Sequence, residues 1–207
     1  MGQLALTQLL PIQELTPGQI GNIRNGAINA VVAMAAKELG LPEDRLVVRD
    51  IRPMTDLELY ASDAVTGSAE NWIFVCATAG TGYKALCASR TMADQRYIAI
   101  FGIRDMRTNI GTTADNVTAA GIIRANDEPK VVSLLRFTIG GAYKVIWDTN
   151  VMTAYRENLV AFSPSVVIIP QNVSYQIEAF KDAAKEGSVM LQLIGVVVEP
   201  RGLTISP

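Results

Sequence analysis

The chain has 207 residues, of which 49% are hydrophobic and 18% charged, so it can build one well-packed domain and is not a largely disordered chain. Its net charge of −2 excludes binding of nucleic acid through a general positive field, which needs clustered lysines and arginines. The sequence contains no histidine, which excludes histidine-based catalytic triads and histidine-ligated zinc sites.

Residues 1–15 form an apolar arm with almost no charge and no clear helical or strand period. This pattern predicts an extended segment that lies on its own domain or on a neighbouring subunit. Residues 4–12 are too short an apolar run to cross a bilayer, and no basic signal-peptide region precedes them, so we expect a soluble protein made in a cytoplasm and no membrane contact. The candidate interface residues are the large aliphatic side chains of the arm: Leu4, Leu6, Leu9, Leu10, Ile12 and Leu15.

A helix is predicted directly after the arm. Thr16 can cap it, Pro17 suits its first position, and Gln19 completes a capping box. Apolar residues then recur at spacings of three and four, until Gly40 and Pro42 end the helix. The narrow, alanine-rich stripe predicts close packing against a sheet or another helix.

From residue 46 onward the pattern changes from helix to strands. Apolar or alternating runs, bounded by turn residues, predict nine strands at residues 46–51, 72–78, 83–89, 97–103, 131–139, 142–147, 166–169, 173–180 and 189–199. Mostly non-helical connections between them indicate an antiparallel β-sandwich, jelly-roll-like, with one α-helix. We therefore expect two regions, an arm and helix over residues 1–45 and a β-sandwich domain over residues 46–207.

Several connections carry their own signals. Gly140 and Gly141 together predict a two-residue hairpin turn. Residues 170–172 and 185–187 predict two further turns, and the polar residues 108–126 predict a long surface loop.

Residues 80–85 formally match the G-x-G-x-x-A turn of dinucleotide-binding proteins. A nucleotide site also needs a helix after the glycines and then a parallel strand. Residues 83–95 leave little room for that helix, and their first part alternates as a strand does. We therefore expect a hairpin in which residues 75–77 pair with the return strand, and no cofactor. Cys76 and Cys87 flank this turn, and the sequence does not decide whether they form a disulfide.

No other motif points to catalysis or to a metal. The acidic clusters lack calcium-binding spacing, and no Walker or nucleophilic serine motif occurs, so we expect no enzyme, no catalytic residue and no metal ligand. A spatial pair of carboxylates, as in glycosidases, remains open. Arg49-Asp50 and Arg104-Asp105 each close a predicted strand. They are either sites for an acidic partner or solvated strand ends with local pairing.

The segment VVIIPQNVSYQIEAF…GSVMLQLIGVVVEPRG, together with the apolar arm and the helix, resembles tailed-bacteriophage virion proteins with a jelly-roll core, and in particular capsid decoration (cement) proteins. The resemblance covers about the last hundred residues and the arm, and it identifies no functional residues. It implies a non-catalytic structural protein of the virion, made in the host cytoplasm. Such proteins sit on the shell between capsomers, contact the major capsid protein and one another, often as trimers, and reinforce the shell.

Two alternatives stay open beside this interpretation. The chain is also compatible with another phage structural component of the neck, tail or baseplate. A β-sandwich that binds a ligand or carbohydrate, or acts as an enzyme, is the second alternative. Assembly surfaces favour the structural class, because an arm with six large aliphatic residues gains roughly 1.5–3 kcal/mol for each one fully buried, before ordering costs.

Overall fold

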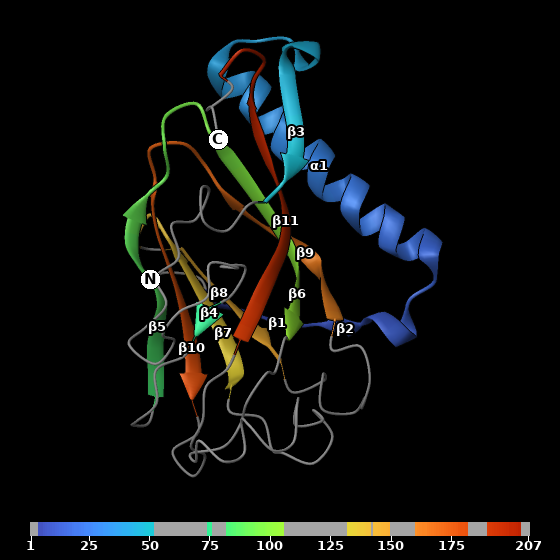
Figure 1. The fold of residues 1–207 in the computed structure, drawn as a ribbon, viewed down its shortest axis with the longest axis vertical. Coiled ribbons are helices and arrows are strands. Elements are labelled where there is room, and N and C mark those ends of the chain that lie inside the picture. The colour runs from blue at the N-terminus through green and yellow to red at the C-terminus, as the bar shows by residue number, and fades with distance from the viewer. Residues whose placement is uncertain are drawn as a thin grey trace, which may run out of the picture.

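The computed structural model describes residues 4–51, 74–75, 82–105, 132–141, 143–149, 160–181 and 190–203. Over these residues the chain is a mainly β sandwich with one long helix, which confirms the fold class expected from the sequence (Figure 1). No helix in this part of the chain is long and apolar enough to span a membrane. The elements are β1 (Leu4–Gln8), β2 (Leu10–Pro11), η1 (Ile12–Glu14), α1 (Pro17–Leu39), η2 (Glu43–Arg45), β3 (Leu46–Asp50), β4 (Phe74–Val75), β5 (Gly82–Thr91), β6 (Tyr97–Asp105), β7 (Val132–Ile139), β8 (Tyr143–Asp148), β9 (Val160–Ile169), β10 (Ser174–Lys181) and β11 (Met190–Pro200).

The strands form two sheets. Sheet A has the order β1-β8-β7-β10-β5, and sheet B has the order β2-β9-β6-β11-β3, with β4 also paired to β11. The β1–β8 pair is parallel, and the other pairs are antiparallel. Four pairs are nested in chain order: β7 with β8, β6 with β9, β5 with β10, and β4 with β11. The first half of the segment from β4 to β11 therefore pairs antiparallel with its second half, and the four pairs are divided between the two sheets.

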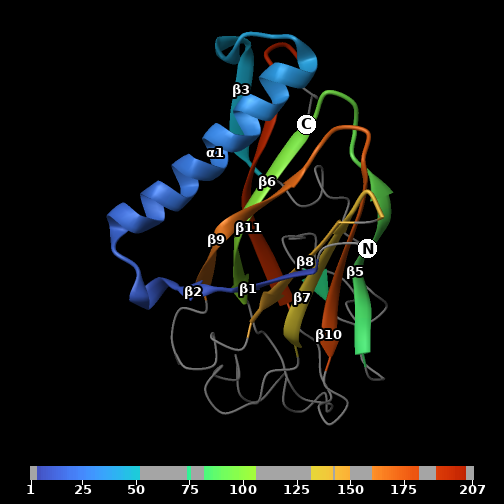
Figure 2. The same ribbon diagram turned by 180° about the vertical axis from the view of Figure 1, so that it is seen from behind.

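Sheet B is the middle of three layers, because it packs against sheet A on one face and against α1 on the other (Figures 1 and 2). Strand β6 shows how a period of two produces this arrangement. Its side chains alternate between the two hydrophobic clusters as far as Phe101: Ile98 and Ile100 face sheet A, whereas Tyr97, Ala99 and Phe101 face the helix. The pairing is irregular at Gly102, and beyond it Ile103 faces sheet A again.

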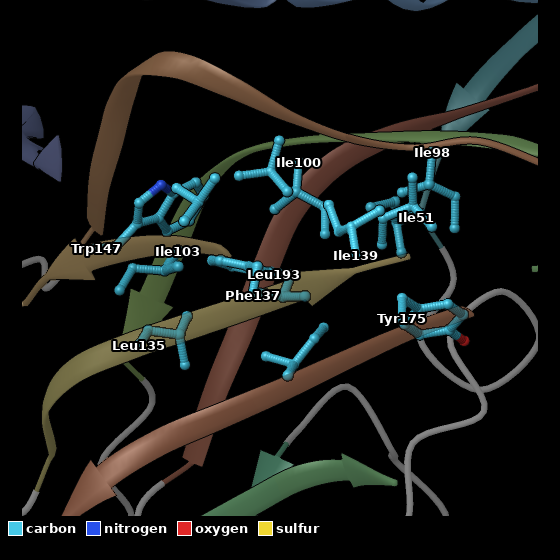
Figure 3. Close-up of a cluster of buried hydrophobic side chains, with 14 of the residues drawn as sticks. Ile51, Ile98, Ile100, Ile103, Leu135, Phe137, Ile139, Trp147, Tyr175 and Leu193 are labelled. Carbon is cyan, nitrogen blue, oxygen red and sulfur yellow. The ribbon is translucent and has the colours of Figure 1, made fainter. Parts of the chain in front are cut away.

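The larger cluster fills the space between the sheets, as Figure 3 shows. Phe137 on β7 and Trp147 on β8 are both buried, and their ring centroids lie 4.7 Å apart in an edge-to-face arrangement. Such aromatic pairs add to the stabilisation that burial alone provides. Tyr175 and Ile177 on β10 also point into this core, as the alternation in residues 173–180 predicts.

The predicted helix is confirmed at both ends. The Thr16 hydroxyl accepts from the backbone N–H of Gln19, and the backbone N–H of Thr16 donates to Gln19 Oε1, which completes the capping box. Gly40 ends α1 in the left-handed conformation that favours glycine. The buried face consists of Ala27, Val31 and Ala35, and these short side chains let the helix lie close to sheet B.

The hairpin expected around the glycine motif is wrong for the part that the structure describes. Phe74–Val75 pairs with β11 in sheet B, whereas β5 pairs with β10 in sheet A, so the two segments belong to different sheets. Cys76 and the rest of the expected turn, residues 77–81, lie outside the described residues. The interpretation of residues 83–89 as a strand is confirmed, because β5 continues for ten residues from Gly82 and leaves no place for the helix of a dinucleotide site.

The other predicted turns have different outcomes. Gly140 and Gly141 both have positive φ and join β7 to β8, but the last strand pair is Ile139 with Tyr143, so the turn is one residue longer than predicted. The turn at residues 170–172 is confirmed. Residues 108–126 and 185–187 lie outside the described residues, and the division of the chain at residue 45 stays a prediction.

Candidate functional site

The N-terminal arm joins both sheets along one side of the sandwich, as Figure 2 shows. Strand β1 pairs with β8 in sheet A, and β2 pairs with β9 in sheet B. Between the two short strands, Leu9 inserts into the core and is 1% exposed. The arm therefore closes the side on which β8 and β9 would otherwise be edge strands.

The six candidate interface residues have different environments. Leu9 is buried in the main core, Ile12 and Leu15 pack against the helix-side cluster, and Leu10 is partly buried. Leu6 is 68% exposed. The side chain of Leu4 lies outside the described part. The arm thus lies on its own domain, one of the two placements that the sequence allows, and contact with another subunit stays a prediction.

A bulge in β9 shapes the surface beside α1. The pairing of β6 with β9 shifts in register between Ile100 and Gly102, so residues 163–166 leave the regular ladder. Pro164 is compatible with such a bulge because it has no N–H to donate to the sheet. Within the bulge, the Ser163 hydroxyl donates to the carbonyl oxygen of Ser165 at 2.6 Å and accepts from its backbone N–H at 3.2 Å.

A groove of about 600 Å³ lies between this bulge and the first half of α1. Its lining combines apolar, amide and hydroxyl groups and contains no charged side chain: Asn22, Ile23, Gly26, Ala27, Phe101, Ser163, Pro164, Ser165 and Val166. The groove suits an uncharged group, and its lining provides no carboxylate or amine for acid–base catalysis.

A set of polar side chains is paired at the opposite end of α1. Glu199 on β11 accepts from Arg96 Nε at 2.6 Å and lies 3.4 Å from an Arg49 guanidinium nitrogen. The Tyr97 hydroxyl donates to Glu38 Oε2 at 2.8 Å. Burial raises the pKa of Tyr97, and the hydrogen bond to Glu38 raises it further. The Tyr97–Glu38 bond fastens the end of the helix to sheet B, and the Glu199 ion pairs join β11 to β3 and to the residue before β6, so both have a structural role.

The two Arg-Asp pairs that close predicted strands do not form a common site in the described structure. Arg49 contacts Glu199, as above, and Asp50 lies 3.7 Å from an Arg24 nitrogen of α1. The Arg24 and Asp50 side chains are mostly exposed, so this ion pair contributes little to stability. Arg104 is exposed on β6, and the side chain of Asp105 lies outside the described part.

The sequence did not single out the surface at the end of β3. Among the described residues, four large hydrophobic side chains are exposed: Leu6, Val47, Val48 and Leu203. Val47 and Val48 are adjacent on β3, and Leu203 follows β11, whose last residue pairs with Leu46. The signal that could have found this surface is the Val-Val pair, because adjacent residues of a strand point to opposite faces.

No group of three potential metal ligands gathers among the residues that the structure describes. In comparisons with protein-family models, curated proteins and solved structures, the chain has no match. The features of the molecule that bear on its function are therefore the arm, the groove and the strand edges.

Proposed function

We propose that this chain is a non-catalytic structural protein of a virion, which decorates a capsid shell by binding the shell protein and further copies of itself. The observation that carries the proposal is the arm. It crosses from one sheet to the other, is held by Leu9, and still leaves Leu6 68% exposed. An exposed leucine on a surface strand is available to a neighbouring protein, and burial in that contact would favour binding.

The strand order supports a jelly-roll core for this protein. Eight strands, β4 to β11, pair first with last, second with seventh, third with sixth, and fourth with fifth. That nesting is the arrangement of two Greek keys in a jelly roll, a fold that virus capsid domains use. Because folds host many functions, this argument supports the structural role without identifying a partner.

The test is a substitution of the exposed arm leucine. Leu6→Asp should leave the far-UV circular dichroism and the unfolding midpoint unchanged, because the side chain is mostly in solvent. Binding to undecorated shells of the virus that encodes the chain, measured by co-sedimentation, should weaken roughly ten- to hundredfold, which corresponds to the burial of one leucine.

The matched control is Leu203→Asp, at a leucine that is 40% exposed and lies outside the arm. This variant should bind shells as the wild type does. If the wild-type protein does not sediment with shells, or if both variants bind as it does, the proposed role of the arm is wrong. Labelling of the chain in whole particles, followed by electron microscopy, separates decoration from a place in the neck, tail or baseplate.

The groove beside the β9 bulge supports the ligand-binding alternative. Its uncharged amide and hydroxyl groups are of the kind that hydrogen-bond carbohydrates. Calorimetric titration with neutral oligosaccharides tests it. Saturable binding that is lost in Asn22→Leu would favour this alternative over the structural role.

A further inference from the structure

Strand β3 is an edge of sheet B with exposed apolar side chains. In the described part of the chain its one strand partner is β11. Val47 is 41% exposed and Val48 36% exposed. An unpaired edge strand offers a row of free N–H and C=O groups, and natural proteins usually protect such edges with charge, proline or a bulge. Val47 and Val48, in the middle part of β3, have none of these protective features.

The direction of the backbone groups on β3 follows from two hydrogen bonds at its ends. The Ile51 N–H donates to the Gly195 carbonyl at 3.1 Å, and the Arg201 N–H donates to the Arg45 carbonyl at 2.7 Å. Bonded residues alternate along an antiparallel strand, so Val47 and Arg49 direct their N–H and C=O toward β11. The N–H and C=O of Val48, the N–H of Asp50 and the C=O of Leu46 therefore point away from the sheet, whereas the Leu46 N–H donates to the Glu43 carbonyl and the Asp50 carbonyl accepts from Arg49 Nη1 at 3.4 Å.

These outward groups are complementary to a second copy of themselves. If two β3 strands run antiparallel about a two-fold axis at Val48, each Val48 faces the other, and each Leu46 faces an Asp50. The two Val48 residues then exchange two hydrogen bonds, and each Asp50 N–H donates to a Leu46 carbonyl, which gives four hydrogen bonds between the copies. The exposed face of Val48 is covered in the same contact.

Charge selects this register over its neighbours. The outward groups recur at every second residue, so the smallest shift that keeps them paired is two residues. In one direction this shift places Arg49 opposite Arg49 of the second copy, and a shift of four residues places Asp50 opposite Asp50. Like charges that are directly opposite destabilise a strand pair. A shift by two residues in the other direction places Arg45 opposite Arg49 and leaves two hydrogen bonds in place of four. The register centred on Val48 has all four bonds and no like charges opposite.

The other edge of sheet B fits this kind of pairing less well. Strand β2 has two residues and ends at Pro11, which cannot donate a hydrogen bond. We propose that two copies of this chain pair through β3, antiparallel about Val48, to form a dimer in which sheet B continues from one subunit into the other. This inference rests on the proposed function, because that function includes binding between copies of the chain. The two-fold dimer differs from the trimer that the resemblance to capsid decoration proteins implies.

Cysteine substitution tests the register directly. In Val48→Cys, the two new thiols face each other with Cα atoms about 5.5 Å apart, within the range of a disulfide. Mild oxidation should give a covalent dimer on a non-reducing gel. In the control Val47→Cys, the two positions are offset by two residues, roughly 8 Å apart, which is beyond that range. This variant should show the level of dimer that wild-type Cys76 and Cys87 give. Equal cross-linking of both variants would overturn the register.

Charge exchange at the same position tests the interface without a covalent bond. Val48→Lys and Val48→Glu should each sediment as monomers, because each places like charges opposite each other. An equimolar mixture should restore the dimer. Circular dichroism shows whether each variant is folded, and an intact fold is expected since Val48 is partly exposed at an edge. A wild-type monomer at every concentration, or no recovery in the mixture of folded variants, would overturn the pairing.

Failure of this inference and failure of the proposed function give different results. A wild-type dimer that cross-links at position 48 but does not bind shells would keep the pairing and remove the decoration role. A wild-type monomer that binds shells through Leu6 would keep the decoration role and remove the pairing.

Discussion

Replacement of the buried arm leucine gives the sharpest test of how the arm is held. Leu9 is 1% exposed and contacts the core between the two sheets. Leu9→Ala removes apolar surface from the core and leaves a cavity, and such changes cost about 2–5 kcal/mol of unfolding free energy. For a chain of this size, about 3 kcal/mol corresponds to a fall in Tm of roughly 6–12 °C.

The assay is urea unfolding at two protein concentrations, with Leu6→Ala as the matched control. Leu6 is mostly exposed, so its truncation should change the unfolding free energy by less than about 0.5 kcal/mol. If the arm lies on its own domain, the loss in Leu9→Ala is the same at both concentrations. A loss that depends on concentration would mean that a neighbour supplies the arm. A loss in Leu9→Ala as small as that in Leu6→Ala would refute the anchoring role of this residue.

Three further predictions concern the elements that support the arm and the sheets. The pKa of Tyr97 is raised in the folded protein, so its phenol ionises first in the unfolded chain, near pH 10. The stabilisation of the fold by the neutral phenol is therefore present below pH about 10 and is lost as the pH rises above it. Denaturant titrations at alkaline pH should show a smaller loss of unfolding free energy for Tyr97→Phe than for the wild type. Gly195→Ala places a Cβ against the Ala99 carbonyl and the Ile51 side chain and should cost about 1–3 kcal/mol in urea unfolding, whereas Gly26→Ala, whose Cβ has free space in α1, should stabilise the protein. Thr16→Ala removes half of the capping box and should lower the unfolding free energy by about 1 kcal/mol; an unchanged value would show that the cap does not contribute.

The sequence was informative where the signal is local. The cap at Thr16 and the left-handed residue Gly40 depend on neighbours within one turn, and both ends of α1 were predicted correctly. The alternation of Tyr175 and Ile177 likewise depends on the period of one strand. These features do not require knowledge of which strands become partners.

The errors arose where distant parts of the chain decide the structure. The glycine turn suggested that residues 75 and 83 belong to one hairpin, but Val75 pairs with Met190 and Tyr83 pairs with Phe180. Strand β9 begins six residues before the predicted start. Pro164 and its serine neighbours interrupt the alternation in the sequence, but the strand pairs with β6 on both sides of them. The sequence could not decide whether the arm lies on its own domain or on a neighbouring subunit. Its aliphatic residues have different environments, since some are buried in the domain and Leu6 is exposed.

The two proposed contact surfaces lie on opposite sides of the sandwich. Leu6 is on β1, the edge strand of sheet A on the side where β2 is the edge of sheet B, whereas β3 is the other edge of sheet B. Pairing through β3 therefore leaves Leu6 of both subunits uncovered, and the dimer carries two arms that can contact a shell together. A bivalent contact exceeds the affinity of one arm by roughly 10²–10⁴ when the geometry allows both to bind. Folded Val48→Lys monomers should accordingly still bind shells, but more weakly than the wild type, although the arm itself is unchanged. Equal binding by monomer and dimer would mean that the two arms of a dimer do not act together.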